Sequence, residues 1–519
     1  MTLTFITNSL THHTAPLADA LSGWLGTDFH FVETKPLRQE RIQLGWQQEP
    51  DRPYLLRTYE CPETAARCRR LALNSDVVLL GSGPDRWILP RLHQHRLTFR
   101  YAERWYKTGV PPGAQARAWL HHGRFRHAPL YLLCASAYAA ADAALAGCYP
   151  GRAYRFGYFP EVKYHNKSAL LAQKDPNGRR LLWAGRFLPW KHPLDAITLA
   201  EQLHGAGLPV HLTFLGSGPE RPTMEREMLR LHLEQQIRIL GPLPPEAVRL
   251  EMEQANLFLL TSDFQEGWGA VLNEAMSSAC AVVSSHAVGA APSLLRHREN
   301  GCLYQSGNLD DLTRQVTFLL THPEEQRRMG AAAYDTMTRL WNPEVAAERL
   351  LTLCRCILAG NPRPKLFRGP LQPGSHSAGP VVPMSISRCT PAANASWIIG
   401  GKVCLALIHL GVSMCAARLL GTEGFGEIQY AAAISGLLLP LCTLGLHDVL
   451  VPELVRCPKN SGAALGTAIG MRLAASLGVL AAWYLLLCLG ASGVAVPSVA
   501  LLYGISLIFQ AAEPLADWF

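Results

Sequence analysis

The sequence predicts an α/β protein built on parallel sheets, followed by a C-terminal all-α segment of four membrane helices. Three observations predict it. Short apolar runs alternate with helical patterns from Thr2 to about Cys354, which is typical of βαβ units. Residues 358–396 are rich in Pro, Gly and Ser, as in a flexible linker. Residues 397–519 then contain four apolar stretches, each close to the roughly 20 residues that cross a bilayer.

Composition narrows the classes of function. At 519 residues the chain is long enough for about three domains of about 100–200 residues. The 14 cysteines include no C-x-x-C pair, so we expect reduced thiols. The net charge of +8 comes from dispersed basic residues, without the patterns of nucleic-acid binders. We therefore expect no nucleic acid partner, because a phosphate-bearing substrate and a nearby anionic membrane explain the charge as well.

Nine strand-like runs divide into two blocks. They are short and apolar, and amphipathic helical patterns separate them. The first block contains Leu3–Thr7, Phe29–Val32, Val77–Leu80 and Leu130–Leu133, and the second contains Leu181–Ala184, Val210–Leu215, Ile237–Leu240, Leu257–Leu260 and Ala281–Ser284. This repetition predicts two Rossmann-like halves with a ligand cleft between them. We expect Phe156–Pro176 to be the crossover and Thr336–Ile357 a final helix that returns to the first half.

The apolar stretches of the C-terminal segment are Trp397–Leu420, Ile428–Leu446, Leu465–Gly490 and Val494–Ala512. Lys and Arg gather before the first stretch and around the connection between the second and third. By the positive-inside tendency, the N-terminal halves then face the cytosol. The start of the chain also lacks the pattern of a secretory signal. We expect a protein of the cell inner membrane whose first two halves face the cytoplasm.

The most specific signal is the segment Ser262–Ala275, which directly follows a strand-like run and opens a predicted helix. A carboxylate in the loop can accept hydrogen bonds from sugar hydroxyls, and one in the helix can reach a ribose diol. Glycines let the backbone approach a ligand, and a helix N-terminus attracts phosphate. The candidate residues are Glu266, Gly267, Trp268, Gly269 and Glu274.

A second group of candidates closes another strand of the second block. Gly185, Arg186 and Lys191 lie in the stretch 184–191. A pyrophosphate leaving group gains negative charge as a glycosidic bond breaks, and paired cations stabilise that charge. Arg186 and Lys191 suit this role. The loop with Gly216 and Gly218 is either a nucleotide-approach loop or an ordinary turn.

These motifs carry a resemblance. Residues Arg180–Cys354 resemble the donor-binding domain of the retaining family-4 glycosyltransferases in a G-R-x-x-x-x-K stretch, a G-x-G-P loop and an E-G-[FW]-G-x4-E pair. The resemblance implies a GT-B fold, a nucleoside-diphosphate sugar as co-substrate, no obligatory metal, and retention at the anomeric carbon. Residues 1–176 would form the acceptor domain and residues 177–357 the donor domain.

The same resemblance implies roles for four residues. Arg186 and Lys191 would hold the diphosphate, Glu274 the ribose and Glu266 the donor sugar. The sequence departs from the family at Ala279-Cys280-Ala281, where a G-x-P is usual, and at Ser293, which replaces a frequent Glu. We expect these changes to alter loop geometry without removing a catalytic charge.

The first half is less informative. His12 and His13 either touch a substrate or belong to a solvated loop, and further cleft candidates are Gly81–Pro84 and Tyr101–Arg104. No dedicated base is identifiable. A front-face retaining mechanism, in which the leaving phosphate takes the acceptor proton, requires none.

The C-terminal segment has a resemblance of its own. The passage Ala416–Gly426 resembles the start of polysaccharide or lipid-linked oligosaccharide flippases, which are similar in an A-R-x-L-G-x-x-x-[FY]-G pattern. Two hypotheses follow. The first is a glycosyltransferase of cell-surface polysaccharide biosynthesis that acts on a glycan or lipid-linked acceptor. The second is a membrane transporter or flippase component whose first part binds sugar nucleotides without turnover.

Overall fold

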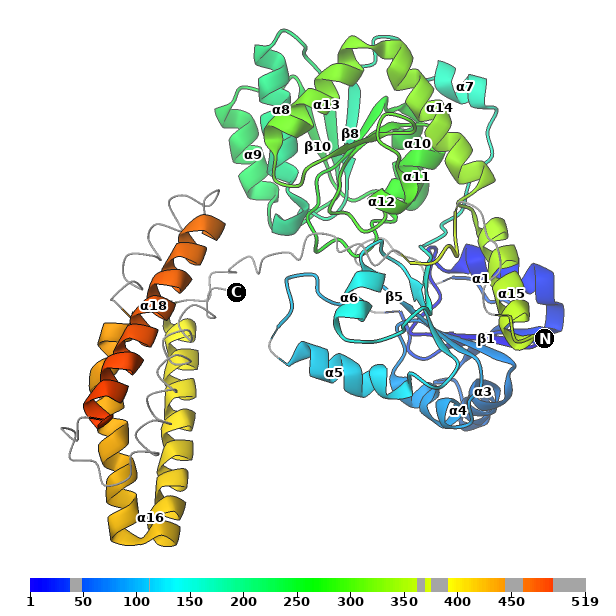
Figure 1. Cartoon of the computed structure of the whole chain (residues 1–519). Coiled ribbons are helices and arrows are strands. Elements are labelled where there is room, and N and C mark those ends of the chain that lie inside the picture. Colours follow the sequence, from blue (N-terminus) through cyan, green and yellow to red (C-terminus); the bar gives the residue numbers. More distant parts are fainter. Residues whose placement is uncertain (38–48, 112, 362–368, 375–390, 444–460, 489–519) are drawn as a thin grey trace. The chain divides into compact units, whose positions relative to one another are not determined.

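The computed structural model describes residues 1–37, 49–111, 113–361, 369–374, 391–443 and 461–488. The chain divides into two compact units, Met1–Ser385 and Ile386–Phe519. The first unit holds two α/β halves, and the described part of the second is helical (Figure 1). The division falls inside the predicted linker 358–396, much of which lies outside the described residues.

The sheet of the N-terminal half has seven parallel strands in the order β3-β2-β1-β4-β5-β6-β7. Their bounds are β1 Leu3–Thr7, β2 Phe29–Glu33, β3 Leu55–Arg57, β4 Val77–Leu80, β5 Thr98–Ala102, β6 Leu130–Cys134 and β7 Ala153–Arg155. The four predicted strands are confirmed to within one residue. Three strands were not predicted: β3 and β7, which have three residues each, and β5, where Arg100 interrupts the apolar run and pairs with Asp85.

The sheet of the second half has six parallel strands in the order β10-β9-β8-β11-β12-β13. Their bounds are β8 Arg180–Ala184, β9 His211–Leu215, β10 Ile237–Leu240, β11 Leu257–Leu260, β12 Ala281–Ser285 and β13 Cys302–Tyr304. All five predicted strands are present, again to within one residue, and only the three-residue β13 was not predicted. Because all strands in each sheet are parallel, their carboxyl ends share one edge.

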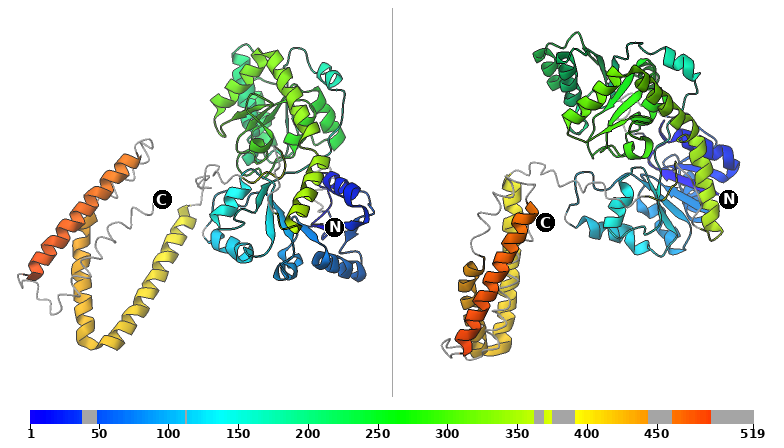
Figure 2. Two further views of the ribbon diagram at one scale, coloured as in Figure 1. Left: turned by 45° about the vertical axis from the view of Figure 1, so that its right-hand side comes forward. Right: turned by 45° about the horizontal axis from the view of Figure 1, so that its top comes forward.

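Helices cover both faces of each sheet (Figure 1). The first half carries α1 Ala15–Leu25, α3 Pro62–Asn74, α4 Leu89–His93, α5 Ala114–His121 and α6 Ala139–Leu145. The second half carries α7 Lys167–Ala172, α8 Pro193–Gly205, α9 Arg221–Arg230, α10 Pro245–Gln254, α11 Val271–Ser277, α12 Ala291–Leu294, α13 Leu309–Thr321 and α14 Pro323–Arg339. The last helix of the unit, α15 Pro343–Leu358, packs against α1, so a final helix does return to the first half (Figure 2). Its predicted start at Thr336 was wrong, because Thr336 still belongs to α14 and the N-cap Asn342 with Pro343 begins the new helix.

Strand alternation divides the core into layers. Successive side chains of a strand point to opposite faces, so Phe5 belongs to one buried cluster and Ile6 to another. The cluster with Phe5 continues into the second half, where it includes Phe258 and Trp268. The two halves therefore share one hydrophobic core, and a separate cluster covers the far face of the second sheet.

The described part of the second unit consists of α16 Pro391–Thr443 and α18 Ser461–Cys488, which pack side by side. The helical path of α16 breaks at Gly421, whose φ is 70°, so the chain reverses there (Figure 2). This break follows the predicted end of the first apolar helix at Leu420. The buried Cys442 of α16 is packed by Leu438 of the same helix and by Val479 of α18.

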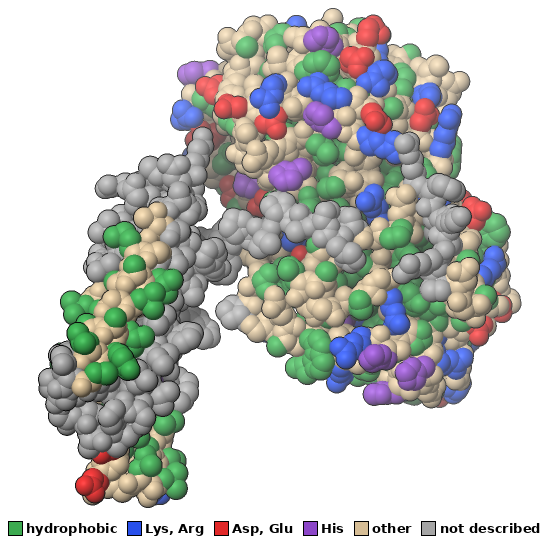
Figure 3. Space-filling view, viewed as in Figure 1, with side chains coloured by type: hydrophobic (Ala, Val, Ile, Leu, Met, Phe, Trp, Pro, Cys, Tyr) green, Lys and Arg blue, Asp and Glu red, His purple; other side chains and the backbone are tan. Residues whose placement is uncertain are grey.

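The described residues do not show the four predicted membrane helices. Among the described residues, one helical stretch, His409–Thr443, is long and apolar enough to cross a membrane, and Gly470–Leu485 is a shorter apolar helix. The predicted span Val494–Ala512 lies outside the described residues. Large apolar side chains are nevertheless exposed on these helices (Figure 3), including Leu419 at 85% and Leu437 at 78%.

Candidate active site

The loops that carry the predicted charges meet at the carboxyl edge of the second sheet. Strand β8 lies between β9 and β11 and is parallel to both. The loops that follow these three strands are therefore neighbours. They hold the stretches 185–191, 216–218 and 262–269, so the fold brings together the segments that the sequence singled out.

Lys191 and Glu266 are in direct contact. Lys191 Nζ donates a hydrogen bond to Oε2 of Glu266, and Ser262 Oγ donates to the same oxygen at 3.1 Å. Both charged side chains are largely buried, at 10% and 13% exposure. The backbone carbonyl of Lys191 accepts a 2.6 Å hydrogen bond from Thr261, which is itself bonded by Trp183 Nε1. This network fixes the cation beside the carboxylate.

Arg186 is placed differently. It lies on the same loop, but its side chain is exposed and, among the described residues, has no ion-pair partner. A solvated guanidinium at this edge can reach an incoming anion without breaking an existing contact. Arg186 and Lys191 are therefore two cations on one loop, one exposed and one already paired with Glu266.

The loop after β9 packs on the loop after β8. Gly216 has φ +136°, and a Cβ there would lie 2.0 Å from the carbonyl oxygen of Gly185. A Cβ on Gly218 would lie 2.4 Å from the carbonyl oxygen of Phe187. The amide of Phe187 also donates to the carbonyl of Ser217 at 2.8 Å. These glycines therefore allow two backbones to touch, and their predicted approach to a nucleotide stays a prediction.

Trp268 is a packing residue in this structure. Its ring has no exposed surface, and its Nε1 donates to Asn273 Oδ1 at 3.0 Å. The ring fills the space beside Gly157 and lies 6.2 Å from the ring of Trp341. A ligand does not reach this ring without rearrangement, which the sequence motif did not reveal. The neighbouring Gly269 has φ +88°, a conformation that favours glycine.

Glu274 lies in α11, in the helix that follows the same loop. Burial raises the pKa of its carboxyl group, and the charge of Arg249 opposes that shift. Arg249 also donates to the backbone carbonyl of Glu274 at 3.0 Å. The predicted contact with a ribose stays a prediction.

His192 and Asp263 form a second pair that the sequence analysis missed. They follow Lys191 and Ser262 directly, and His192 Nε2 lies 3.3 Å from Asp263 Oδ2. This hydrogen bond raises the pKa of His192, with support from the charge of Asp195. Their positions next to motif residues were the available signal.

The N-terminal half contributes side chains to the same region. Glu103, from the predicted candidate Tyr101–Arg104, is bonded by Lys107 Nζ at 2.5 Å and by the hydroxyl of Tyr158 at 2.8 Å. The ring of His13 stacks on Tyr158 with centroids 6.3 Å apart, which brings one of the two candidate histidines beside this cluster. Neither Lys107 nor Tyr158 belonged to a recognisable motif.

Two other first-half candidates have structural contacts. Arg104 forms a buried ion pair with Asp142, and its guanidinium lies 5.6 Å from the ring centroid of Phe264 in the second half. Ser82, in the candidate Gly81–Pro84, shares a 2.9 Å hydrogen bond with Thr7 at the end of β1. Arg104 therefore helps to join the two halves, and Ser82 joins two strand ends.

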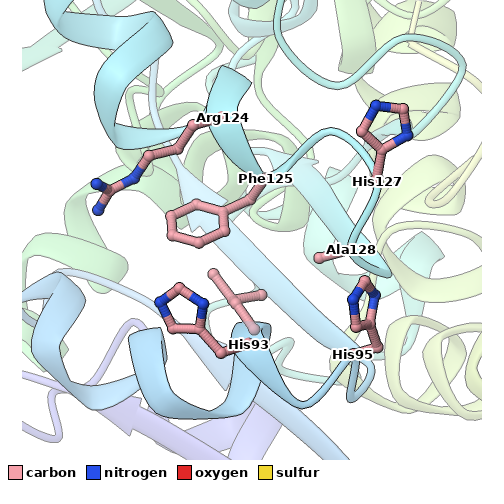
Figure 4. A pocket seen from close by; sticks show the side chains of 7 residues that line it. His93, His95, Arg124, Phe125, His127 and Ala128 are labelled. Carbon is pink, nitrogen blue, oxygen red and sulfur yellow. The ribbon is translucent and has the colours of Figure 1, made fainter.

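A separate pocket lies at the opposite edge of the first sheet (Figure 4). It has a volume of about 280 Å³ and lies before strands β5 and β6, at their amino ends. Its lining residues are Leu92, His93, His95, Arg124, Phe125, His127 and Ala128. None of them belongs to the group of charges described above.

Part of the chain that holds this site is similar to a known protein family. Residues 171–336 match the family described as Glycosyl transferases group 1. The chain is 28% identical over 155 residues to N-acetyl-alpha-D-glucosaminyl L-malate synthase of Bacillus anthracis. The aligned residues make up 30% of this chain and 40% of that relative. The chain thus spans less than half the length of this relative.

Solved structures show the same fold. The Anabaena protein Alr3699/HepE, solved in complex with UDP, matches with a TM-score of 0.52 and 16% identity, covering 69% of this chain and 100% of that one. Sucrose-phosphate synthase from Thermosynechococcus elongatus matches with the same TM-score, identity and coverage. At this identity the likeness shows the fold alone. Residues 171–336 therefore form a glycosyl transferases group 1 domain within an α/β chain of GT-B-like fold.

Proposed function

We propose that this chain is a glycosyltransferase that moves a sugar from a nucleoside-diphosphate sugar to a glycan or lipid-linked acceptor. The contact between Lys191 and Glu266 carries the proposal, because it sets a phosphate-binding cation beside a carboxylate suited to sugar hydroxyls. The group 1 match of residues 171–336 supports it. The UDP complex of the similar Anabaena structure makes uridine nucleotides the first donors to test.

The proposed chemistry uses charge rather than a dedicated base. As the bond to the sugar breaks, negative charge grows on the diphosphate, and Arg186 and Lys191 stabilise it. Glu266 orients the sugar and Glu274 the ribose. In keeping with the resemblance to family 4, we propose retention at the anomeric carbon and no obligatory metal. The leaving phosphate then takes the proton of the acceptor hydroxyl.

We also propose that the enzyme works at the cytoplasmic face of the cell inner membrane, in cell-surface polysaccharide biosynthesis. The apolar stretch His409–Thr443 and the exposed leucines of the second unit support a membrane contact. Lipid-linked acceptors would be available at that surface. Flotation of the full chain with liposomes tests this part, and a chain that stays at the bottom of the gradient contradicts it.

Transfer of a radiolabelled sugar tests the main proposal. The full chain is incubated with a panel of nucleotide sugars, and turnover by transfer or hydrolysis is compared with that of Glu274→Ala and Arg186→Ala. Equal turnover in all three proteins contradicts the assignment. Binding of nucleotide sugars without any turnover favours the second hypothesis, a membrane transporter or flippase component with a non-catalytic sugar-nucleotide-binding domain.

A further inference from the structure

The loop with Glu266 approaches the N-terminal half at Gly267. A Cβ on Gly267 would lie 1.8 Å from Oε2 of Glu103 and 2.7 Å from Nζ of Lys107. Real Cβ atoms essentially never come closer than 3.0 Å to a neighbour. Gly267 therefore leaves the space that Glu103 occupies, so this carboxylate of the first half lies against the residue that follows Glu266.

Two donors hold the Glu103 carboxylate in place. Lys107 Nζ donates to Oε2 at 2.5 Å, and the Tyr158 hydroxyl donates to Oε1 at 2.8 Å. The Tyr158 ring packs edge-on against Trp268 and Tyr101, with centroids 6.4 and 5.8 Å away, so the donor hydroxyl is itself positioned. An ionised carboxylate has about four acceptor sites, which leaves room for further donors. Its side chain is 29% exposed and can be reached by a ligand.

We infer that Glu103 binds a hydroxyl of the transferred sugar and so helps to determine which sugar is used. The inference rests on the proposed function. Glu103 borders the backbone of Gly267, which directly follows Glu266, so we expect a sugar that hydrogen-bonds to Glu266 to lie within reach of Glu103 as well. The sugar would then be held by one carboxylate from each half. A site with a placed polar acceptor selects against sugars that lack the matching hydroxyl, because the acceptor is left unpaired.

Binding measurements on the full chain test this inference without a known acceptor. Dissociation constants are measured by calorimetry for UDP and GDP and for a panel of their sugars, with wild type, Glu103→Gln and the control Glu246→Gln. Glu246 is an exposed carboxylate at the start of α10. For the sugar nucleotide that wild type binds most tightly, we expect Glu103→Gln to weaken binding about tenfold, as for the loss of one hydrogen bond to a charged group. Binding of the free nucleotide should stay within about twofold.

A second variant separates positioning from folding. Tyr158→Phe keeps the Glu103 carboxylate but removes one of the donors that orient it, so we expect a smaller loss, about threefold, that is again confined to the sugar nucleotide. Unchanged affinity of Glu103→Gln for the sugar nucleotide overturns the inference. An equal loss for the free nucleotide also overturns it, since Glu103 would then support the loop rather than the sugar. Failure of wild type to bind any nucleotide contradicts the proposed function itself, which is a different outcome.

Discussion

Lys191 donates a hydrogen bond to Glu266 across the carboxyl ends of two neighbouring strands, β8 and β11. In the free chain each of these largely buried charges neutralises the other. Under the proposed function, a diphosphate bound at this edge would compete for Lys191 and leave Glu266 able to accept hydrogen bonds from a sugar. The ion pair thus links the predicted phosphate and sugar sites.

Removal of the cation at this pair should reduce sugar transfer. Lys191→Met keeps the length of the side chain but withdraws positive charge from the leaving diphosphate. We expect transfer to fall on the order of 10²–10³-fold, as for the loss of one preorganised group that stabilises transition-state charge. Arg226→Gln, on the exposed face of α9, is the control. Transfer by Lys191→Met at the wild-type rate would show that the diphosphate binds elsewhere.

The contact between the two glycine loops should matter for stability. Gly216→Ala places a Cβ 2.0 Å from the Gly185 carbonyl, at a φ of +136°. We expect a loss of about 1–3 kcal/mol in the free energy of unfolding, measured by urea or thermal denaturation. Gly205→Ala is the matched control, since nothing lies within 4 Å of its Cβ position. If both variants unfold at the same urea concentration, the loop contact is not a constraint.

The His192–Asp263 pair predicts a pH dependence of stability. The folded state raises the pKa of His192 above its ordinary value of 6.5, so the stabilisation is complete below pH 6.5 and disappears as pH rises through the folded pKa. Asp263→Asn should therefore lower stability at about pH 5.5 and have little effect at about pH 8.5. Because the side chains are 39% and 28% exposed, solvent screening limits the effect to less than about 1 kcal/mol.

Denaturation curves of wild type and Asp263→Asn, measured at both values of pH, test this pH dependence. His192→Gln is the control, because it removes the titrating group and should abolish the difference between the two values of pH. A stability deficit of Asp263→Asn that grows with rising pH would contradict the sign of the shift.

Substitutions of Trp268 test whether this aromatic motif residue packs in the core or binds a ligand. Trp268→Ala should cost about 3–5 kcal/mol in the free energy of unfolding, because the ring is fully buried. Trp268→Phe keeps most of the packing and loses the bond to Asn273, so it should stay folded with nucleotide-sugar affinity near that of wild type. Stable folding of Trp268→Phe together with a tenfold or greater loss of that affinity would instead assign the ring to ligand binding.

The sequence by itself determined nine strands, the division into two α/β halves and the two neighbouring loops that carry Arg186, Lys191 and Glu266. These features are local, because an apolar run predicts a strand and the parallel topology then gathers the ends of such strands at one edge. The short strands β3, β7 and β13 were not predicted, since three residues are too few to show the alternating pattern of a strand.

Tertiary structure alone decided which side chains meet across the halves. Nothing near Glu103 in the sequence indicates that it lies against Gly267, and nothing in the motif shows that Trp268 points into the core while Glu266 pairs with Lys191. These relationships depend on how two packed halves share one hydrophobic core, and such contacts between distant residues follow from packing rather than from local pattern.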